Sequence, residues 1–430
     1  FWYDLGIFDE TVWRISRFQL PIIPQLDAPY GKLVWGDHFN LTLMLLAPLY
    51  WITDRAEIIL LAQVLTVVAA SLIAYALARK YLQYPLVRVT LVISFLGFVG
   101  MQNALYTDVH NIVFATLPMM ATIWALYGKR FNWYWVFLLL TLGIQENIAG
   151  IGVGLGLFLL IRKERDTRRG IATIILSIAW AVVVTKWIMP NISGHAYDYQ
   201  PEFPKLWYEW FTRLFWTLDM KGKTIFVSYA TFGLLPIVSL PTFPLVLGHF
   251  VERFVLNSAA TRWDLGFHYN APLSPIMFLG AFDVLLRIQN QPRIKKLLPY
   301  WAFVTIGIVI YLHRFYLHGP LMLATHPTFY AQTGKFGFMR EFMKTIPENK
   351  LVMTQNNIAA HLTHQNVILL SLDYAKINPD TIAIDIRDGQ NANNFFPLHP
   401  YEVNELVASI SGSPRYKMIK INEQILFILQ

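Results

Sequence analysis

The first residues of the chain that could do chemistry are three carboxylates close to its start. Asp4, Asp9 and Glu10 lie within seven residues, next to aromatic side chains such as Trp2 and Phe8. An apolar setting disfavours the ionised form of a carboxyl group and raises its pKa toward neutrality, which suits a general base. The competing interpretation is that these acids are only solvated beside a membrane helix. If they are functional, the expected chemistry is removal of a proton from a hydroxyl group.

Two acid–histidine pairs follow in short polar stretches. Asp37 and His38 can bind an anion or a metal, or they can mark a helix start at which Asp37 is the cap. Asp108 and His110 alternate in a tight turn, so both side chains point the same way and can ligate a divalent ion or bind a phosphate. The alternative for this second pair is a cap of the next helix.

The most informative acid is Glu146, because Gln145-Glu146-Asn147 interrupts a long apolar run. An ionisable residue in hydrocarbon costs ~2.5–3.5 kcal/mol, so it normally faces a cavity or a partner. We predict that Glu146 and Asp108 are candidate metal ligands. The alternative for Glu146 is a short turn outside the membrane.

A third polar group precedes a later apolar run. Arg262 and His268 are reasonable phosphate contacts, with Tyr269 beside them. The alternative is that they anchor the chain at the membrane interface. The aromatic-rich stretch 197–216 is typical of an interfacial belt, and it would also suit a cover for a lipid tail.

Composition indicates the elements that must position these residues. Only 14% of the residues are charged and the mean hydropathy is +0.42, whereas soluble domains have roughly 25% charged residues. Apolar runs long enough to span a bilayer recur. We predict helices over 57–78, 85–106, 111–127, 133–161 (as two helices), 171–189 (stopped by Pro190), 271–286 and 298–317, and a kinked hairpin or a broken helix over the proline-containing segment 224–247. The abrupt opening of the chain suggests that one upstream helix is missing.

The net charge of +8 reports topology. Basic residues concentrate in four short stretches between the apolar runs, at 79–80, 129–130, 162–169 and 287–296. This is the pattern of cytoplasmic loops, and it argues against nucleic acid as a partner. With these loops inside, helix parity places every polar cluster described above on the outer face. The chain has no cysteine, which excludes disulfides and thiolate chemistry.

The sequence therefore predicts a mainly α protein with three parts. Residues 1–56 form an extracytoplasmic loop whose apolar piece 41–52 re-enters or lies in the interface, and residues 57–318 form a polytopic transmembrane helix bundle. Residues 319–430 form a small extracytoplasmic α/β domain, with strands near 351–355, 367–371, 381–387 and a hairpin at 416–429. We interpret His361 and His364 in this domain as ordinary surface histidines.

Several of these motifs resemble those of a prokaryotic family of predicted integral membrane proteins, domain of unknown function family 2079. The resemblance covers most of the chain. The opening motif Tyr3 to Asp9 is its most specific part, and the other matching motifs are His38-Phe39, Leu46 to Tyr50, Asp108-Val109-His110, Gln145-Glu146-Asn147 and His268-Tyr269. Gln145 and Asn147 depart from the family pattern by replacing a basic and an acidic residue.

That family is similar in layout to the GT-C glycosyltransferases, membrane enzymes that use a polyprenyl-phosphate-linked sugar on the outer face. The resemblance implies that Asp4 or Asp9 is the catalytic base, and that His38, His110, Arg262, His268 and Tyr269 bind the donor phosphate or substrate. It implies a polyprenyl-phosphate lipid as partner, a glycan, lipid or protein acceptor, a multi-pass location in the plasma membrane, and a divalent metal (Mg²⁺ or Mn²⁺) as candidate cofactor. The alternatives are a transporter or lipid flippase, whose broken helices and intramembrane acid would form a path, and a non-catalytic membrane scaffold.

Overall fold

The computed structural model describes residues 3–26, 30–317, 336–348 and 350–430. The chain forms two compact units, and each unit combines segments that are distant in sequence. The first unit comprises Phe1–Val34, Met44–Leu60 and His326–Gln430, and the second comprises Trp35–Leu43 and Leu61–Thr325. The predicted three-part division into residues 1–56, 57–318 and 319–430 stays a prediction.

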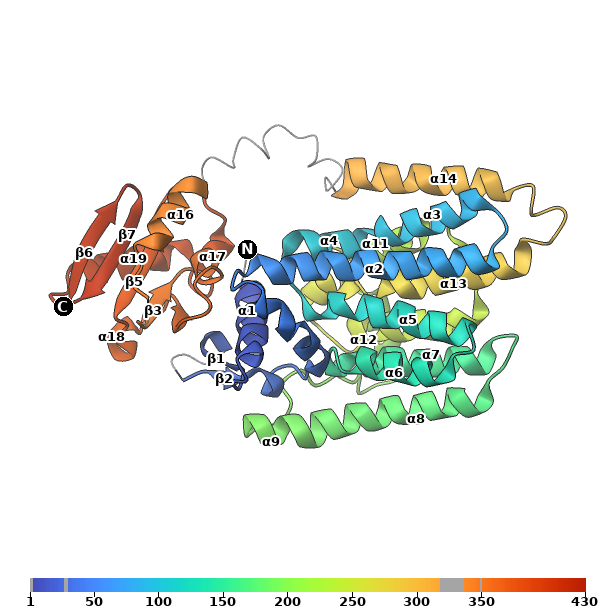
Figure 1. Cartoon of the computed structure of the whole chain (residues 1–430), viewed down its shortest axis with the longest axis horizontal. Coiled ribbons are helices and arrows are strands. Elements are labelled where there is room, and N and C mark those ends of the chain that lie inside the picture. Colours follow the sequence, from blue (N-terminus) through green and yellow to red (C-terminus); the bar gives the residue numbers. More distant parts are fainter. Residues whose placement is uncertain (1–2, 27–29, 318–335, 349) are drawn as a thin grey trace. The chain divides into compact units, whose positions relative to one another are not determined.

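The second unit is a helix bundle with short apolar helices between longer ones (Figure 1). Four helices of the described residues are long and apolar enough to cross a membrane, or five if one bent pair is a single span. The helices are α2 (Glu57–Tyr81), α3 (Pro85–Leu96), α4 (Val99–Thr107), α5 (Thr116–Tyr127), α6 (Phe131–Leu142), α7 (Ala149–Ile161), α8 (Thr167–Val183), α9 (Met189–Ser193), α10 (Glu209–Phe215), α11 (Leu218–Ala230), α12 (Phe243–Phe254), α13 (Leu273–Ile288) and α14 (Leu298–Tyr311).

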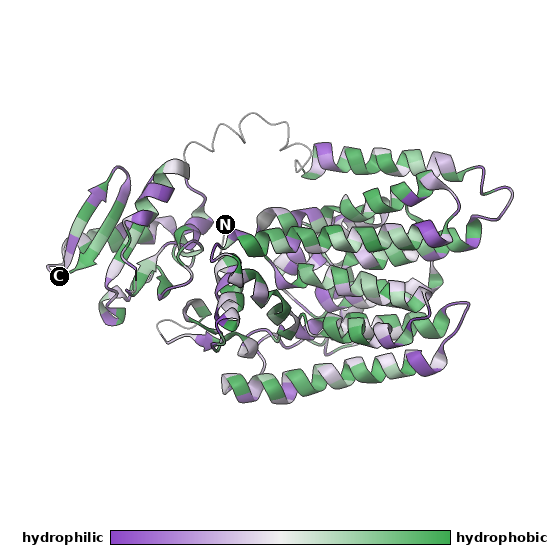
Figure 2. Cartoon of the chain, viewed as in Figure 1, coloured by the Kyte–Doolittle hydropathy of each residue, from purple (hydrophilic) through white to green (hydrophobic). Residues whose placement is uncertain are grey.

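The four basic stretches lie at one end of this bundle, where Figure 2 shows hydrophilic loops at the ends of apolar helices. The backbone N–H of Gln83 donates to Gln289 Oε1 at 3.0 Å, and the Tyr81 hydroxyl donates to the Tyr127 carbonyl at 2.7 Å. The guanidinium of Arg162 lies 5.4 Å from the ring centroid of Tyr127. Contacts therefore join all four loops, as the sequence predicted.

The polar clusters of the second unit lie at the opposite end of the same helices. Residues 108–110 follow α4, residues 145–147 connect α6 to α7, and residues 268–270 precede α13. The other ends of α6, α7 and α13 lie at basic stretches, and α4 continues from α3, which begins next to the basic stretch 79–80. We call this the polar end of the second unit.

The predicted single helix over residues 85–106 is wrong, because α3 and α4 meet at a bend of 43°. Gly97 ends α3 and packs directly against α14, where a Cβ at this position would lie 2.4 Å from Val309 Cγ1. Its carbonyl bonds to His313 Nε2 at 3.0 Å instead of continuing the helix. Close packing at a glycine therefore breaks the span.

Pro190 does not end the helix that the sequence predicted over 171–189. The helix begins earlier, at Thr167, and continues through a π-helical segment, η6 (Val184–Ile188), to Ser193. Pro190 follows directly after this π-helical segment, at the start of α9, where the change in hydrogen-bond pattern accommodates its missing N–H. The helix ends at Gly194, whose left-handed φ of 77° forms the C-cap.

The proline-rich segment forms a hairpin of broken helices. The 3₁₀ turns η7 (Leu235–Val238) and η8 (Leu240–Thr242) connect α11 to α12. Lys221 near the start of α11 donates to the carbonyl of Phe254 at the end of α12, at 3.1 Å. The start of α11 and the end of α12 therefore lie together.

The first unit contains a five-stranded sheet in the order β4-β3-β5-β7-β6. The strands are β3 (Val352–Thr354), β4 (Val367–Leu369), β5 (Thr381–Asp385), β6 (Tyr416–Ile421) and β7 (Gln424–Leu429). β3 is parallel to β4 and β5, whereas β7 is antiparallel to β5 and β6. The small α/β domain and its terminal hairpin agree with the sequence prediction.

Helices cover both faces of this sheet because its central strands bury both sets of alternating side chains. Met353 and Ile382 pack with α19 (Pro400–Ser411), and Val352 and Ala383 pack with α16 (Phe336–Lys344). The shorter helices are α17 (Asn356–Ala359), α18 (Tyr374–Ile377) and the 3₁₀ turn η14 (Ala392–Phe395).

The amino-terminal part of the first unit is α1 (Tyr3–Ser16) with a two-stranded ribbon, β1 (Ile22–Ile23) and β2 (Lys32–Leu33). The turns η1 (Pro24–Leu26) and η2 (Val34–Gly36) flank the strands. The short apolar piece predicted over 41–52 is a 3₁₀ helix, η3 (Leu41–Trp51), interrupted by Pro48.

Candidate functional site at the polar end of the second unit

A buried carboxylate organises the polar end of the second unit. The side chain of Glu146 is 1% exposed, and its Oε1 lies 3.0 Å from His38 Nδ1. The Tyr197 hydroxyl donates to the same oxygen at 2.8 Å, and the backbone N–H of Phe39 donates to Oε2 at 3.0 Å. We call Glu146, His38 and Tyr197 the Glu146 cluster. Three segments that are distant in sequence meet in it.

The local sequence explains why the helix breaks at this carboxylate. Gly143 ends α6, and the extended Gln145 precedes the 3₁₀ turn η5 (Glu146–Ile148). The segment that carries His38 is held on this break, because the backbone N–H of Thr42 donates to the Gly143 carbonyl at 2.9 Å. A Cβ at position 143 would lie 2.6 Å from Thr42 Oγ1, so the close approach requires glycine.

His38 lies in an electrostatic field that favours its charged form. Burial disfavours the imidazolium, but the Glu146 carboxylate, with a smaller contribution from Asp37, outweighs burial and raises the pKa of His38 above its ordinary value. The ring also stacks on Tyr199, with centroids 4.7 Å apart, and the Tyr199 hydroxyl donates to Asp37 Oδ1 at 3.1 Å. Asp37 therefore pairs with a side chain from a distant segment.

Tyr197 and Tyr199 have a role that neither interpretation of residues 197–216, as an interfacial belt or as a cover for a lipid tail, included. Both hydroxyl groups donate to carboxylates of the site, although the following residues Phe203, Trp207 and Trp216 remain exposed. A sequence signal could have distinguished these two tyrosines from the exposed aromatic residues. The composition around residue 198 is polar and acidic, whereas the part that follows is rich in tryptophan.

Asp108 and His110 are held by a residue that the sequence analysis did not select. Gln63 on α2 is buried; its Nε2 donates to the Asp108 carbonyl at 2.9 Å, and its Oε1 accepts from the His110 backbone N–H at 2.8 Å. The His110 ring stacks on His268, with centroids 3.8 Å apart. A single glutamine within an apolar helix was the available signal for this contact.

A buried arginine positions the third polar group. Arg253 on α12 is 1% exposed, and its guanidinium donates to the Arg262 carbonyl and, at 2.7 Å, to Asn270 Oδ1. It also lies 3.1 Å from His249 Nε2. These bonds fix the turns η9 (Ala260–Arg262) and η10 (His268–Asn270) against α12, so Arg253 determines where Arg262 and Tyr269 lie.

Arg262 connects this group with the Glu146 cluster. Its guanidinium lies 4.4 Å from the ring centroid of Tyr269 and 3.8 Å from a carboxylate oxygen of Glu252. It is also close enough to His38 to lower the pKa of that imidazole slightly. Glu252 and Arg253 were not among the residues predicted from the sequence, although three ionisable residues at positions 249, 252 and 253 follow an apolar run.

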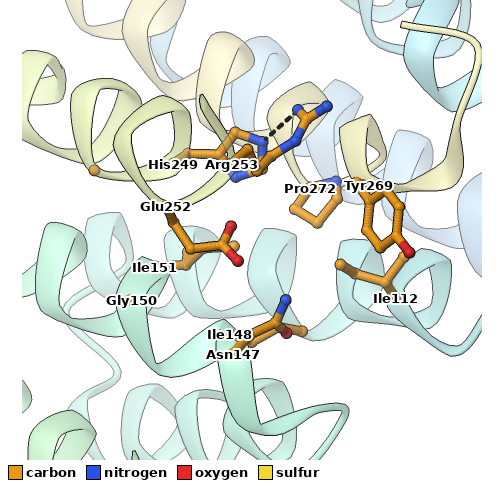
Figure 3. Close-up of a pocket in the computed structure, with 11 residues that line it drawn as sticks. Ile112, Asn147, Ile148, Gly150, Ile151, His249, Glu252, Arg253, Tyr269 and Pro272 are labelled. Atoms are coloured by element: carbon orange, nitrogen blue, oxygen red, sulfur yellow. Dashed lines mark hydrogen bonds between the residues drawn. The ribbon is translucent and has the colours of Figure 1, made fainter. Parts of the chain in front are cut away.

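A partly open pocket lies beside these residues, with about 380 Å³ of empty space that includes open solvent at its mouth. Figure 3 shows the Glu252 carboxylate pointing into it from α12, Asn147 approaching from η5, and Tyr269 on the far side. Ile112, Ile151 and Pro272 supply apolar walls. The pocket is therefore lined by both polar and apolar groups at the polar end of the bundle.

The two proposed bases lie on α1 in the first unit, in different surroundings. Asp4 is half-buried, whereas Asp9 is fully buried and accepts hydrogen bonds from the hydroxyls of Tyr50 and Thr363. His364 Nε2 lies 3.0 Å from the Asp9 carboxylate. Asp9 is thus held by the carboxy-terminal part of the first unit.

His364 is not the ordinary surface histidine that the sequence suggested. It is 18% exposed, and its ring stacks on Trp13 with centroids 4.5 Å apart. Next to this contact, burial raises the pKa of Glu10 to about 7, against the opposing effect of its ion pair with Arg14. A raised pKa is what the apolar setting of Glu10 predicts.

The structure thus brings His38 together with Glu146, His110 with His268, and Arg262 with Tyr269. Both oxygens of Glu146 are engaged by hydrogen-bond partners, which does not fit a metal ligand, so no step below depends on a metal. The Mg²⁺ or Mn²⁺ ion named as a candidate cofactor stays a prediction.

The fold and the site define a mainly helical membrane protein with a charged cluster at one end of its helix bundle. The model of a family described as predicted membrane proteins, DUF2079, matches residues 2–418. The chain therefore belongs to the DUF2079 family, as its motifs suggested. No curated protein and no solved structure gives a match to the chain.

Proposed function

We propose that this protein is a membrane glycosyltransferase of GT-C-like layout, which transfers a sugar from a polyprenyl-phosphate-linked donor to a glycan, lipid or protein acceptor. The observation that carries the proposal is that the polar end of an apolar bundle holds the His38–Glu146 pair together with the turns that carry Arg262 and His268. A phosphate joined to a lipid chain needs cationic and hydrogen-bonding groups at the end of apolar helices, where its tail stays in the membrane.

The reaction needs a base, a departing phosphate and a fixed geometry. The acceptor oxygen forms a bond to the anomeric carbon of the sugar, the bond from that carbon to the phosphate oxygen breaks, and polyprenyl phosphate leaves. The proton of the acceptor hydroxyl passes to a carboxylate of α1. Arg262 and protonated His38 stabilise the charge that develops on the leaving phosphate.

Between the two carboxylates we propose Asp4 as the base and Asp9 as a positioning residue. The support is that Asp9 already accepts bonds from Tyr50 and Thr363 and is fully buried, whereas Asp4 keeps part of its surface exposed. A base must reach the hydroxyl proton directly, so an exposed carboxylate suits that role better.

The proposal includes a multi-pass topology in the plasma membrane with the four basic loops in the cytoplasm. The support is that these loops share one end of the second unit. The polar end is then extracytoplasmic, and so is the α/β domain that follows α14.

The direct test is sugar transfer by the purified full chain in lipid nanodiscs, from radiolabelled polyprenyl-phosphate-linked sugars to an extracted membrane-glycan acceptor. We expect Arg262→Gln to reduce transfer by about 10²-fold or more. Arg293→Gln, which removes an exposed arginine from a basic loop, is the matched control and should leave transfer unchanged. Equal activity of the two variants would refute the role of Arg262.

The broken segment η7–η8 favours a transporter or lipid flippase as the second candidate. Single cysteines at Gly150 and Gly248 distinguish the two candidates, because the chain has no cysteine and a Cβ at either position meets no neighbour within 4 Å. Labelling only from the outside favours the enzyme, and labelling from both sides favours transport.

A further inference from the structure

The pocket between α7 and α12 has a lining that restricts what can bind there. Its polar groups are Asn147 and Glu252, with Tyr269 across the space (Figure 3). The Glu252 side chain keeps 36% of its surface exposed, although the residue lies among packed helices. A carboxylate that points into a pocket can accept hydrogen bonds from a ligand that binds there.

Asn147 adds a second acceptor to the same pocket. Its amide nitrogen points toward Glu252 (Figure 3), and its buried Oδ1 has no hydrogen-bond partner among the described residues. A buried carbonyl oxygen without a partner costs free energy, which a donor group on a ligand would recover. The pocket therefore presents two acceptor groups, from η5 and from α12.

The charged groups at the pocket already have partners within the protein. The Arg253 guanidinium is engaged by Arg262, Asn270 and His249, so it offers the pocket little hydrogen-bonding capacity. Arg262 lies 3.8 Å from Glu252 and compensates its negative charge. The group that this lining fits is neutral and rich in hydrogen-bond donors.

Two glycines leave the space for such a group. Gly150 on α7 and Gly248 on α12 both line the pocket and are exposed, and a Cβ at either position would meet no neighbouring atom within 4 Å. Ile112 and Pro272 supply apolar walls, against which the C–H face of a sugar ring can pack.

We infer that this pocket binds the hydroxyl groups of the donor's sugar, with Glu252 and Asn147 as the residues that recognise them. The inference rests on the proposed function and adds a sugar subsite beside the phosphate contacts. Arg262, which lies between Glu252 and Tyr269, marks the boundary between the two. The subsite selects a neutral hydroxylated sugar over an anionic or amino sugar.

The test measures the affinity of the full chain in nanodiscs for a panel of polyprenyl phosphates. The panel comprises the sugar-free lipid and the lipids that carry glucose, mannose, arabinose, glucuronic acid or an amino sugar. We expect Glu252→Gln and Asn147→Ala to weaken binding of the preferred neutral-sugar lipid by about tenfold or more. Binding of the sugar-free lipid should stay unchanged, which shows that the phosphate contacts remain intact.

A steric variant tests the pocket without changing its polar groups. Gly248→Leu places a side chain in the open space and should weaken binding of the neutral-sugar lipid by tenfold or more, again without affecting the sugar-free lipid. Gly307→Leu is the matched control, because Gly307 on α14 is also exposed with no neighbour within 4 Å of a Cβ and lies outside the pocket.

The outcomes separate this inference from the proposed function. Wild-type transfer together with unchanged neutral-sugar affinity in Glu252→Gln, Asn147→Ala and Gly248→Leu would overturn the sugar subsite alone. Tighter binding of the glucuronic acid or amino-sugar lipid than of every neutral one would also overturn it. A wild-type chain that neither binds nor transfers from any lipid of the panel would overturn both.

Discussion

The Glu146–His38 pair gives a prediction whose size follows from the geometry. His38 Nδ1 lies 3.0 Å from a carboxylate that is 1% exposed. Hydrogen bonds to charged groups stabilise a fold by about 1.5–3 kcal/mol each. Removing one member of a buried pair costs about 3–5 kcal/mol, because the other is left without compensation. We therefore expect Glu146→Gln and His38→Ala each to destabilise the chain.

A double-mutant cycle isolates the energy of the pair itself. The free energy of unfolding is measured by titration with a denaturing detergent in mixed micelles, for wild type, Glu146→Gln, His38→Ala and the double variant. We expect a coupling energy of about 1.5–3 kcal/mol. Tyr199→Phe is the matched control, because its hydroxyl bonds Asp37 rather than Glu146 and the variant keeps the ring that stacks on His38.

The coupling should also depend on pH. The folded pKa of His38 is raised, so the ion pair contributes fully below the ordinary histidine pKa of about 6.5 and is lost as the pH rises through the higher folded value. A coupling energy below about 0.5 kcal/mol at pH 6 would refute this account of the Glu146 cluster. A coupling energy equal to that between Tyr199→Phe and His38→Ala would refute it as well.

Three further predictions concern groups outside the candidate site. Glu10→Gln should stabilise the chain by up to ~3 kcal/mol at pH 8, because folding raises the pKa of Glu10 to about 7. This stabilisation should vanish near pH 4, where the carboxyl group is protonated in both states. An effect on thermal unfolding that does not depend on pH would contradict the prediction. Lys221→Met should destabilise by about 1–3 kcal/mol, since its ammonium caps α12 at the Phe254 carbonyl, and an unchanged melting temperature would refute that role. His364→Ala should increase the rate of limited proteolysis in the carboxy-terminal domain by loosening its contact with Asp9, and wild-type rates would show that the contact is not stabilising.

The sequence predicted the parts of the fold that depend on local pattern. One end of the bundle was indicated by the basic stretches at 79–80, 129–130, 162–169 and 287–296. Lysine and arginine between apolar runs concentrate in the loops on one side of a membrane protein. The alternation of the tail likewise predicted the sheet and its terminal hairpin. The break at Glu146 was predictable since an acid cannot continue an apolar helix at low cost.

The contacts that assemble the site could not be predicted in this way. Asp9 and Thr363 are separated by 354 positions, and His38 and Glu146 by 108. The sequence around a buried carboxylate does not indicate which distant residue will form a hydrogen bond with it. Pro190 was misjudged for a related reason, because the π-helical turn before it makes its missing N–H harmless.

The most direct test of the proposed function is the transfer of labelled sugar from a polyprenyl-phosphate donor by the wild-type chain, compared with Asp4→Asn and with Asp4→Asn/Asp9→Asn. The account predicts transfer by wild type and a loss of about 10²–10⁴-fold in Asp4→Asn, because the acceptor proton no longer has a base. Equal turnover by wild type and the double variant would contradict the assignment of the base to α1. The absence of transfer by the wild type from every donor would contradict the glycosyltransferase itself.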